Sequence, residues 1–552
     1  MHLHRRLEFL PKLETGYQTH QQALLLATGL ISCLTFLTPI LSIITDIPAL
    51  IFVAIFGAGY CVIILLLRQL LVGALVGLIV ASPFAANVPL ASHTYLATLP
   101  GHLGPQLWLV QAPLLLSVIL VILPNPRNIL DGATRTEGLF AVFVGWTVLA
   151  AIFGATARLD TALYFSLLMA QAFISFVLLR YVVQQQILSF RTVLQVFVGT
   201  ILAQCIVAVA QFFHGSSFGI TTLGEGDSIP LSTLSFGPLG TFTTGTYIQG
   251  FSGMSFNLAS LIILSVPIIV FISVEKRNKS RILLIGAVLL MTAVLRATAS
   301  DAARGGLIVS IMLLIVYYIY LSAIRGKLSP VGSPVGTALS QGLKQSKSVW
   351  VSTLTAILIL FYPSSISGAE SVTTNINAEP TTSSNQSAAS QSTGGGAEKI
   401  LETLSIPYFD LTSLGVRFQQ YFGGLDLMFQ HPLFGIGGAN FIYFSTMYGL
   451  SEPYPLHSIY IALLAETGIL GFVSYVIVVC SVLWYSWKLG LEASDNNLLY
   501  IGIFCGMIGY LAFGFWDVLQ LIKITSLIPF WILAGAIVGE YVKTHRAAQS
   551  IV

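Results

Sequence analysis

Charged side chains are scarce in this sequence. Of its 552 residues only 9% are Asp, Glu, Lys or Arg, whereas 55% are hydrophobic. A soluble domain carries about 25% charged residues, so this chain has too few to cover a water-facing surface of its own size. The net charge of +3 is also too small to indicate a nucleic-acid partner. The composition therefore argues against a soluble enzyme, a nucleic-acid-binding protein or a disordered scaffold, and it favours an integral membrane protein.

Sequence patterns for metals and disulfides are missing as well. The cysteines lie singly in apolar runs, and none has a neighbour at metal-ligand spacing. No cluster of acidic residues offers another site for a cation. Hence no metal, no cofactor and no disulfide framework is predicted, and the cysteines are expected to be small buried side chains.

Long apolar runs are abundant in this sequence. A membrane-spanning helix needs about 20 mostly apolar residues, and the chain offers about 14 such segments, with a range of about 12–14. The predicted fold class is thus an all-α integral membrane protein of about 14 transmembrane helices with a large extracytoplasmic loop. The predicted spans are 23–45, 47–67, 69–90, 107–123, 139–157, 161–183, 190–213, 251–274, 281–297, 306–324, 349–367, 457–483, 498–520 and 523–543.

The distribution of Lys and Arg orients these spans. With the N-terminus in the cytoplasm and strict alternation, about 19 of the 25 Lys and Arg residues fall inside, as the positive-inside rule expects. Both chain termini are therefore predicted to be cytoplasmic, in a multi-pass protein of the inner or plasma membrane. The cations predicted outside are Arg158, Arg296, Arg304, Lys399, Arg417 and Lys523.

Two predicted outside loops, at about 214–250 and 368–456, are longer than simple connections. Part of the second, 371–396, is low-complexity Ser, Thr, Asn, Gln and Gly sequence, which is typical of disorder. These loops divide the chain into a cytoplasmic segment 1–22, an N-terminal transmembrane bundle 23–249, a transmembrane core 250–367, an extracytoplasmic loop 368–456 and C-terminal transmembrane helices 457–552.

Residues 411–430 of the second loop predict an amphipathic helix. Thr412 or Ser413 can cap its start, and apolar residues then recur at helical spacing. Such a helix would lie on the outer membrane surface or dock on the bundle. Arg417 falls at the edge of the apolar stripe, so it would point toward the bundle or the lipid headgroups, and a snorkelling interfacial arginine is the simplest explanation. The stripe consists of Leu414, Phe418, Tyr421, Leu425 and Phe429.

Several ionisable residues stand at the outer ends of predicted spans. His457 opens a span at the border between loop and lipid, where a pKa near neutrality would let it exchange a proton. Glu466 lies well inside that span, where a carboxylate must face a partner or a cavity. Each also has a structural alternative, as a hydrogen-bonded histidine and as a carboxylate bonded to backbone or hydroxyl groups. Upstream, Arg296 and Arg304 flank Asp301, and one of them is able to form a simple ion pair with it.

The order of these features resembles the shared module of the O-antigen ligase and O-antigen polymerase superfamily. That order is Arg417 on the outside helix, the segment HPLFGIGGANF at 431–441, His457 at the opening of a span, and the segment ETGILG at 466–471. Two upstream segments also resemble family elements: Arg304-Gly305-Gly306, and Gly250-Phe251 followed by Asn257.

This resemblance, over about 250–472, implies a membrane glycosyltransferase. The implied reaction moves a glycan from a polyprenyl-diphosphate carrier to a hydroxyl on the outer membrane face. The resemblance makes His457 the general base and places Arg304 and Arg417 on the diphosphate. Supporting positions are implied for Arg296, Asn257, Glu466 and His431.

The physical logic agrees with these roles. A sugar hydroxyl is a poor nucleophile, so a base has to take its proton as it attacks the anomeric carbon. The lipid diphosphate leaves as a stable anion without a general acid, and guanidinium groups stabilise its charge without Mg²⁺. A single displacement predicts inversion at the anomeric carbon. The expected partners are the polyprenyl-diphosphate-linked glycan, a hydroxyl on a glycan, glycolipid or protein, and membrane lipid.

Several functions are open at this point. A ligase attaches a finished glycan to another molecule, a polymerase joins repeat units, and an oligosaccharyltransferase modifies protein; the motifs suit each of them. A small-solute transporter is the alternative from a different class, because many spans and the intramembrane Glu466 also suit solute passage. A transporter would spread essential charges over both sides of the membrane, whereas the candidates here cluster at one face, which favours the enzyme. A structural membrane subunit explains the composition but not that cluster.

Overall fold

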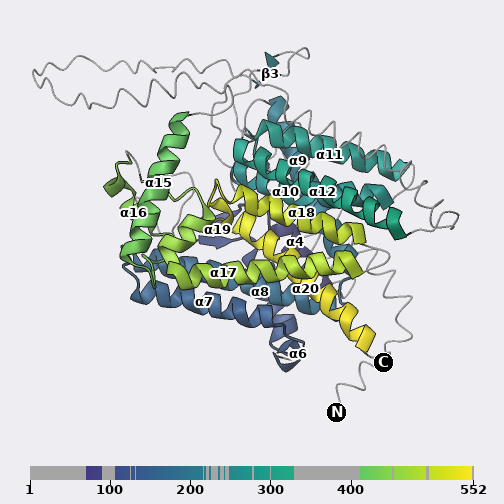
Figure 1. Cartoon of the computed structure of the whole chain (residues 1–552), viewed down its shortest axis with the longest axis horizontal. Coiled ribbons are helices and arrows are strands. Elements are labelled where there is room, and N and C mark those ends of the chain that lie inside the picture. The colour runs from purple at the N-terminus through teal and green to yellow at the C-terminus, as the bar shows by residue number, and fades with distance from the viewer. Residues whose placement is uncertain are drawn as a thin grey trace, which may run out of the picture.

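Helices make up most of the computed structural model (Figure 1). Within the described residues, four strands of two or three residues form two antiparallel pairs. The predicted predominance of helix is therefore confirmed. The structure describes residues 70–89, 106–124, 126–130, 132–214, 217–218, 220, 223–225, 234–235, 241–242, 248–275, 279–298, 300–328, 411–450, 453–492 and 497–549. The predicted segment 1–22, the predicted spans 23–45, 47–67 and 349–367, and the low-complexity segment 371–396 lie outside these residues.

The first half of the fold is built around three long apolar helices, α7, α8 and α9. A buried ion pair joins α8 to α7, with Arg180 Nε 2.8 Å from Glu137 Oε1. The elements are α4 (Leu70–Ala81), β1 (Asn87–Pro89), β2 (Gln106–Trp108), α5 (Gln111–Ser117), a π-helical turn (Val118–Ile122), α6 (Pro126–Leu130), α7 (Arg135–Phe153), α8 (Leu159–Gln184) and α9 (Phe190–His214).

The predicted span 69–90 is wrong in its second half. Helix α4 ends at Ala81, and the hydroxyl of Ser82 donates to the carbonyl oxygen of Ile79 at 2.8 Å. Pro83 follows, and proline has no N–H with which to continue the helix. The chain then forms β1, which pairs with β2, so the predicted span 107–123 also begins as a strand.

The second half of the fold packs against the first through its last helix. Helix α20 lies along α8, whereas α18 lies between α10 and α12 (Figure 1). The elements are β3 (Leu234–Ser235), β4 (Thr241–Phe242), α10 (Ser255–Glu275), α11 (Lys279–Ala297), α12 (Asp301–Leu328), α15 (Leu411–Gln430), α16 (Phe441–Phe444), a 3₁₀ turn (Ser445–Tyr448), α17 (Ile459–Glu492), α18 (Asn497–Phe513), α19 (Leu519–Ile522) and α20 (Ile524–Gln549).

Six of the described helical segments are long and apolar enough to cross a membrane. They are Arg135–Phe153, Leu159–Gln184, Phe190–His214, Ser255–Ser273, Ile459–Glu492 and Ile524–Arg546. This supports a multi-pass membrane protein, whereas the total of about 14 spans stays a prediction.

Helix α15 has the bounds that its periodicity predicts, although it begins ahead of both cap candidates. It lies with α16 at one end of the long helices α7 and α17, on the left in Figure 1. At this end the backbone N–H of Ile459 donates to the carbonyl oxygen of Gly514 at 2.9 Å and joins the start of α17 to the end of α18. We call the region formed by α15, the start of α17 and the end of α18 the α15 end.

Candidate active site

His457 lies at the α15 end, just before α17 begins. The hydroxyl of Tyr421 on α15 donates to the carbonyl oxygens of His457 and Phe515, each 3.0 Å away. Burial raises the pKa of Tyr421 to about 12, so this hydroxyl keeps its proton at neutral pH. The backbone of His457 is thus fixed by α15 and by the segment that follows α18.

The imidazole of His457 is held by Gln420, whose side chain is fully buried. The Gln420 Oε1 atom accepts a hydrogen bond from the backbone N–H of His457 at 3.2 Å and lies 2.8 Å from the ring Nδ1. Because a backbone N–H can only donate, the amide oxygen must face His457, and Nδ1 must then carry the ring proton. The Nε2 atom is left with a lone pair, which is the state that a general base needs.

The pKa of His457 also favours the neutral ring. Burial and the nearby charge of Arg417 lower this pKa from 6.5 to about 4, against a smaller opposing contribution from the backbone at Pro455. The ring is therefore uncharged at neutral pH, with its single proton on Nδ1.

Arg417 supplies a positive charge beside this histidine. It is half-buried on α15, one turn before Gln420 and Tyr421, and its charge lowers the pKa values of both His457 and Tyr421. Its guanidinium makes no hydrogen bond or ion pair with the part of the chain that the structure describes. A guanidinium without such a partner can bind an anionic ligand.

Helix α15 docks through two glycines and, of the predicted stripe, through the hydroxyl of Tyr421. A Cβ atom at Gly423 would lie 2.7 Å from the ring of Tyr448, and Gly424 approaches α17 as closely. Such an approach requires residues without a side chain. The stripe residues Phe418 and Phe429 are 53% and 75% exposed, so they do not dock on the described part of the bundle.

Arg304 lies in the first turn of α12, which begins at the same end of the bundle. Gly306, in the next turn, lies against Gly509 and Phe513 near the end of α18. The Nη1 atom of Arg304 is 3.0 Å from Asp301 Oδ1, so the simple ion pair considered for these residues is present. Its Nε is buried and has no hydrogen-bond partner among the described residues. Arg304 therefore keeps a donor for a ligand. No described contact joins it to His457.

Arg296 and Asn257 are both buried in the fold. Arg296 lies in the last turn of α11, where a cation is favoured by the helix dipole, and it is engaged in further interactions. The Asn257 Nδ2 donates to the carbonyl oxygen of Ser252 at 2.8 Å, and its Oδ1 accepts from the Ser526 hydroxyl at 3.1 Å. These contacts give Asn257 a structural link between the start of α10 and α20.

Glu466 fastens the glycine-rich loop (residues 431–441) to α17. Its carboxylate accepts hydrogen bonds from the backbone N–H groups of Ala439 at 2.7 Å and Phe441 at 3.3 Å, and the residue is 4% exposed. These bonds match the structural alternative raised for this residue. They occupy backbone donors just before and at the start of the short helix α16.

The break in α17 makes further contacts with the glycine-rich loop. Gly468 has φ 70° and ψ −179°, and a Cβ atom there would collide with the backbone of the glycine-rich loop. The N–H of Ile469 donates to the carbonyl oxygen of Pro432 at 2.9 Å, and Trp146 Nε1 donates to the carbonyl oxygen of Thr467 at 2.9 Å. The segments 431–441 and 466–471 therefore stabilise each other through these contacts.

His431 is half-buried at the start of the loop, and its backbone bonds to Leu427 and Gly435. Its ring makes no hydrogen bond within the described residues. The functional residue that sequence reasoning missed is Gln420. It follows Arg417 at a spacing of three, which places both on one helix face, and this spacing is the signal that could have identified it.

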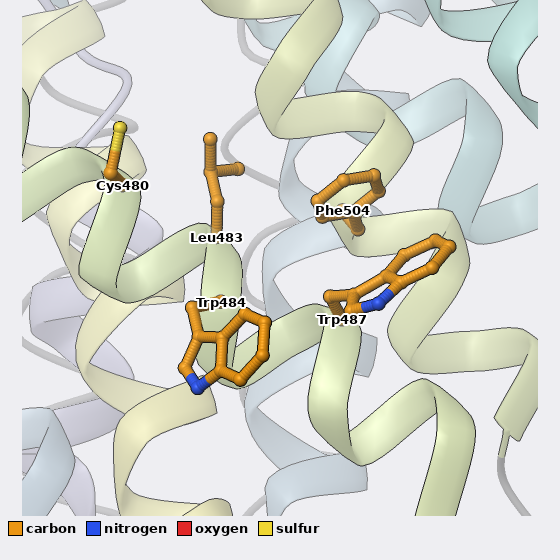
Figure 2. A pocket seen from close by; sticks show the side chains of 5 residues that line it. All are labelled: Cys480, Leu483, Trp484, Trp487 and Phe504. Carbon is orange, nitrogen blue, oxygen red and sulfur yellow. The ribbon is translucent and has the colours of Figure 1, made fainter.

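An apolar groove of about 350 Å³ lies between α17 and α18, far from this site. Figure 2 shows its lining residues Cys480, Leu483, Trp484, Trp487 and Phe504. It lies about 30 Å from the start of α17, at 1.5 Å per residue. Because its lining is hydrocarbon apart from one thiol and two indoles, it offers no acid, base or cation for the proposed chemistry.

No group of three or more His, Cys, Asp or Glu with the arrangement of a metal site occurs among the described residues. A comparison with curated proteins finds no match. Residues 286–476 match the family model described as O-antigen ligase. The matched segment contains Arg296, Arg304, Arg417, His457 and Glu466, and Asn257 precedes it. The chain therefore carries an O-antigen ligase domain at 286–476 together with several helices able to cross a membrane, which supports a multi-pass membrane protein of the O-antigen ligase and polymerase superfamily.

Proposed function

We propose that this protein moves a glycan from a polyprenyl-diphosphate carrier to an acceptor hydroxyl. The O-antigen ligase domain supports glycosyl transfer in general terms. The specific proposal depends on two observations: Gln420 holds Nδ1 of His457, and the nearby Arg417 guanidinium has no partner among the described residues.

In the proposed step, Nε2 of His457 takes the proton of the acceptor hydroxyl as its oxygen attacks the anomeric carbon. A new bond forms between that oxygen and the carbon, and the bond from the carbon to the diphosphate oxygen breaks. The electron pair leaves with the lipid diphosphate. One displacement of this kind inverts the anomeric configuration.

In this scheme Arg417 and Arg304 stabilise the leaving diphosphate. Negative charge grows on the diphosphate as the bond breaks, and a fixed guanidinium stabilises such charge better than water that must reorient. Within the described residues, Arg417 has no partner and Arg304 keeps a buried Nε without one. We assign both to the diphosphate. We place the site on the outer membrane face, with both chain termini in the cytoplasm.

Ligase, polymerase and protein oligosaccharyltransferase share this step and differ in the acceptor. We favour a ligase because the matching family model is described as O-antigen ligase. A transporter would need no base with a fixed tautomer, so the geometry around His457 favours the enzyme.

The test uses purified protein in lipid with a polyprenyl-diphosphate-linked glycan and candidate acceptors. Release of free polyprenyl diphosphate is followed for the wild type and for His457→Ala. The matched control is His545→Ala, since His545 pairs with Glu492 at the opposite end of α17. We expect release by the wild type and the control only, and the acceptor that supports it identifies the transferase class. Normal release by His457→Ala would overturn the base assignment, and uptake of solute without release would favour the transporter.

A further inference from the structure

Lys523 is a buried cation that the proposed function does not use. It lies between α19 and α20 and is only 7% exposed. Its ammonium makes no hydrogen bond or ion pair in the part of the chain that the structure describes. Burying an unpaired charge is costly, and natural folds usually place a partner beside it. The partner of Lys523 is therefore expected to come from outside the described part of the chain.

The surroundings of Lys523 favour an anion. Its carbonyl oxygen accepts from the N–H groups of Ser526 at 3.1 Å and Leu527 at 2.9 Å, so α20 starts at this residue. The positive end of a 26-residue helix dipole thus lies at the backbone of Lys523. The hydroxyl of Thr525, in the same first turn, is fully buried and has no hydrogen-bond partner among the described residues. A cation, a helix N-terminus and an unused hydroxyl donor together form a site for a phosphate group.

A short series of contacts connects this site to His457. One turn before Lys523, Gln520 lies against Gly514, which accepts the hydrogen bond of Ile459 close to His457. One turn after it, Ser526 bonds to Asn257 at the start of α10. Lys523 therefore lies between the start of α10 and the start of α17, at the α15 end.

We propose that Lys523, Thr525 and the N-terminus of α20 bind a phosphate of the lipid-diphosphate donor. This inference rests on the proposed function for the identity of the donor. It adds a third cation, outside the matched domain 286–476, to the two arginines.

The test compares Lys523→Met with Lys543→Met, a control on the same helix whose lysine pairs with Glu540 at 2.7 Å. Without ligand, Lys523→Met should raise the Tm because it removes an unpaired buried charge, whereas Lys543→Met should leave the Tm unchanged or lower it. Polyprenyl diphosphate in detergent should raise the Tm of the wild type and of the control, and raise that of Lys523→Met much less. In the transfer assay, the donor KM of Lys523→Met should rise at least about tenfold with the acceptor KM unchanged.

Three results would count against the site. A lower ligand-free Tm in Lys523→Met, with an unchanged response to polyprenyl diphosphate, would make Lys523 a structural residue. A Tm response to phosphatidylglycerol but not to polyprenyl diphosphate would assign the phosphate site to membrane lipid and overturn the donor assignment. An unchanged donor KM in a transferring enzyme would remove the site and leave the proposed function intact. Binding of polyprenyl diphosphate by a protein that transfers no glycan would support the phosphate site and overturn the proposed function.

Discussion

One amide oxygen sets the chemical state of His457. Because Gln420 Oε1 faces both the backbone N–H and the ring Nδ1 of this residue, the ring can offer only Nε2 as a base. The positive charge of Arg417 helps to keep the ring neutral in the absence of substrate. The same charge is well placed to attract an anionic donor, so one arginine serves both purposes.

The pH dependence of the reaction follows from this environment. With a pKa of about 4 for His457, the acid limb of kcat/KM should lie near pH 4 instead of near 6.5, since kcat/KM reports the free enzyme. Between these values the unfolded histidine binds a proton that the folded one does not, so folding stability should fall as the pH drops from 6.5 to 4. An Arg417→Gln variant should move the acid limb upward. An acid limb near 6.5 in the wild type would contradict the assignment.

Gln420 can be tested with two substitutions of similar size. Gln420→Met removes the acceptor, so His457 loses its fixed tautomer, and kcat should fall at least about tenfold. Gln420→Glu keeps the acceptor but adds a negative charge, so activity should persist while the pKa of His457 and the acid limb of the pH profile rise. A purely structural glutamine would give no such shift of the profile. Equal pH profiles for all three proteins would show that Gln420 does not act through His457.

At the scale of elements, the glycine-rich loop and the break in α17 form one unit. The loop satisfies the N–H of Ile469 beyond the break, and Glu466 satisfies the N–H groups of Ala439 and Phe441. A helix break inside an apolar bundle would otherwise leave these groups without partners, at about 1–3 kcal/mol each. The residues that the family resemblance highlights here thus build a support for the site.

Glu466→Ala should consequently destabilise the protein by about 2–6 kcal/mol, because it leaves two buried donors unpaired. Glu466→Gln retains one acceptor oxygen and should cost less. Thermal unfolding in detergent measures both effects. The folded fraction of Glu466→Gln should transfer glycan at a near-normal rate; a large loss of kcat with unchanged Tm would instead give this carboxylate a part in the chemistry.

At the scale of the whole molecule, composition and periodicity predict the helical class and the bounds of α15. They do not predict which face of α15 docks. The close approach depends on the glycines at 423 and 424, and a pattern of apolar side chains does not include glycine. They also miss Gln420, since a polar residue on an outside helix is expected to face water. The span predicted at 69–90 is too long because hydropathy does not take into account that Pro83 lacks the N–H needed to continue the helix.

The predicted orientation of the bundle can be measured directly. In a variant that lacks the exposed Cys480, a cysteine placed at Phe422 should react with a membrane-impermeant maleimide in intact cells, because α15 is expected outside. A cysteine at His545, at the opposite end, should react only after the membrane is opened. Reaction of both in intact cells, or the reverse order, would overturn the positive-inside assignment.

Helix α15 presents Phe418, Phe422 and Phe429 outward while its opposite face orients His457. If these rings rest at the lipid surface, as amphipathic helices do, the bilayer itself sets the height of the base above the point where a carrier lipid emerges. Bilayer thickness and lipid packing then become variables of the reaction rate. The same enzyme would run at different speeds in membranes of different composition, with no change in any protein contact.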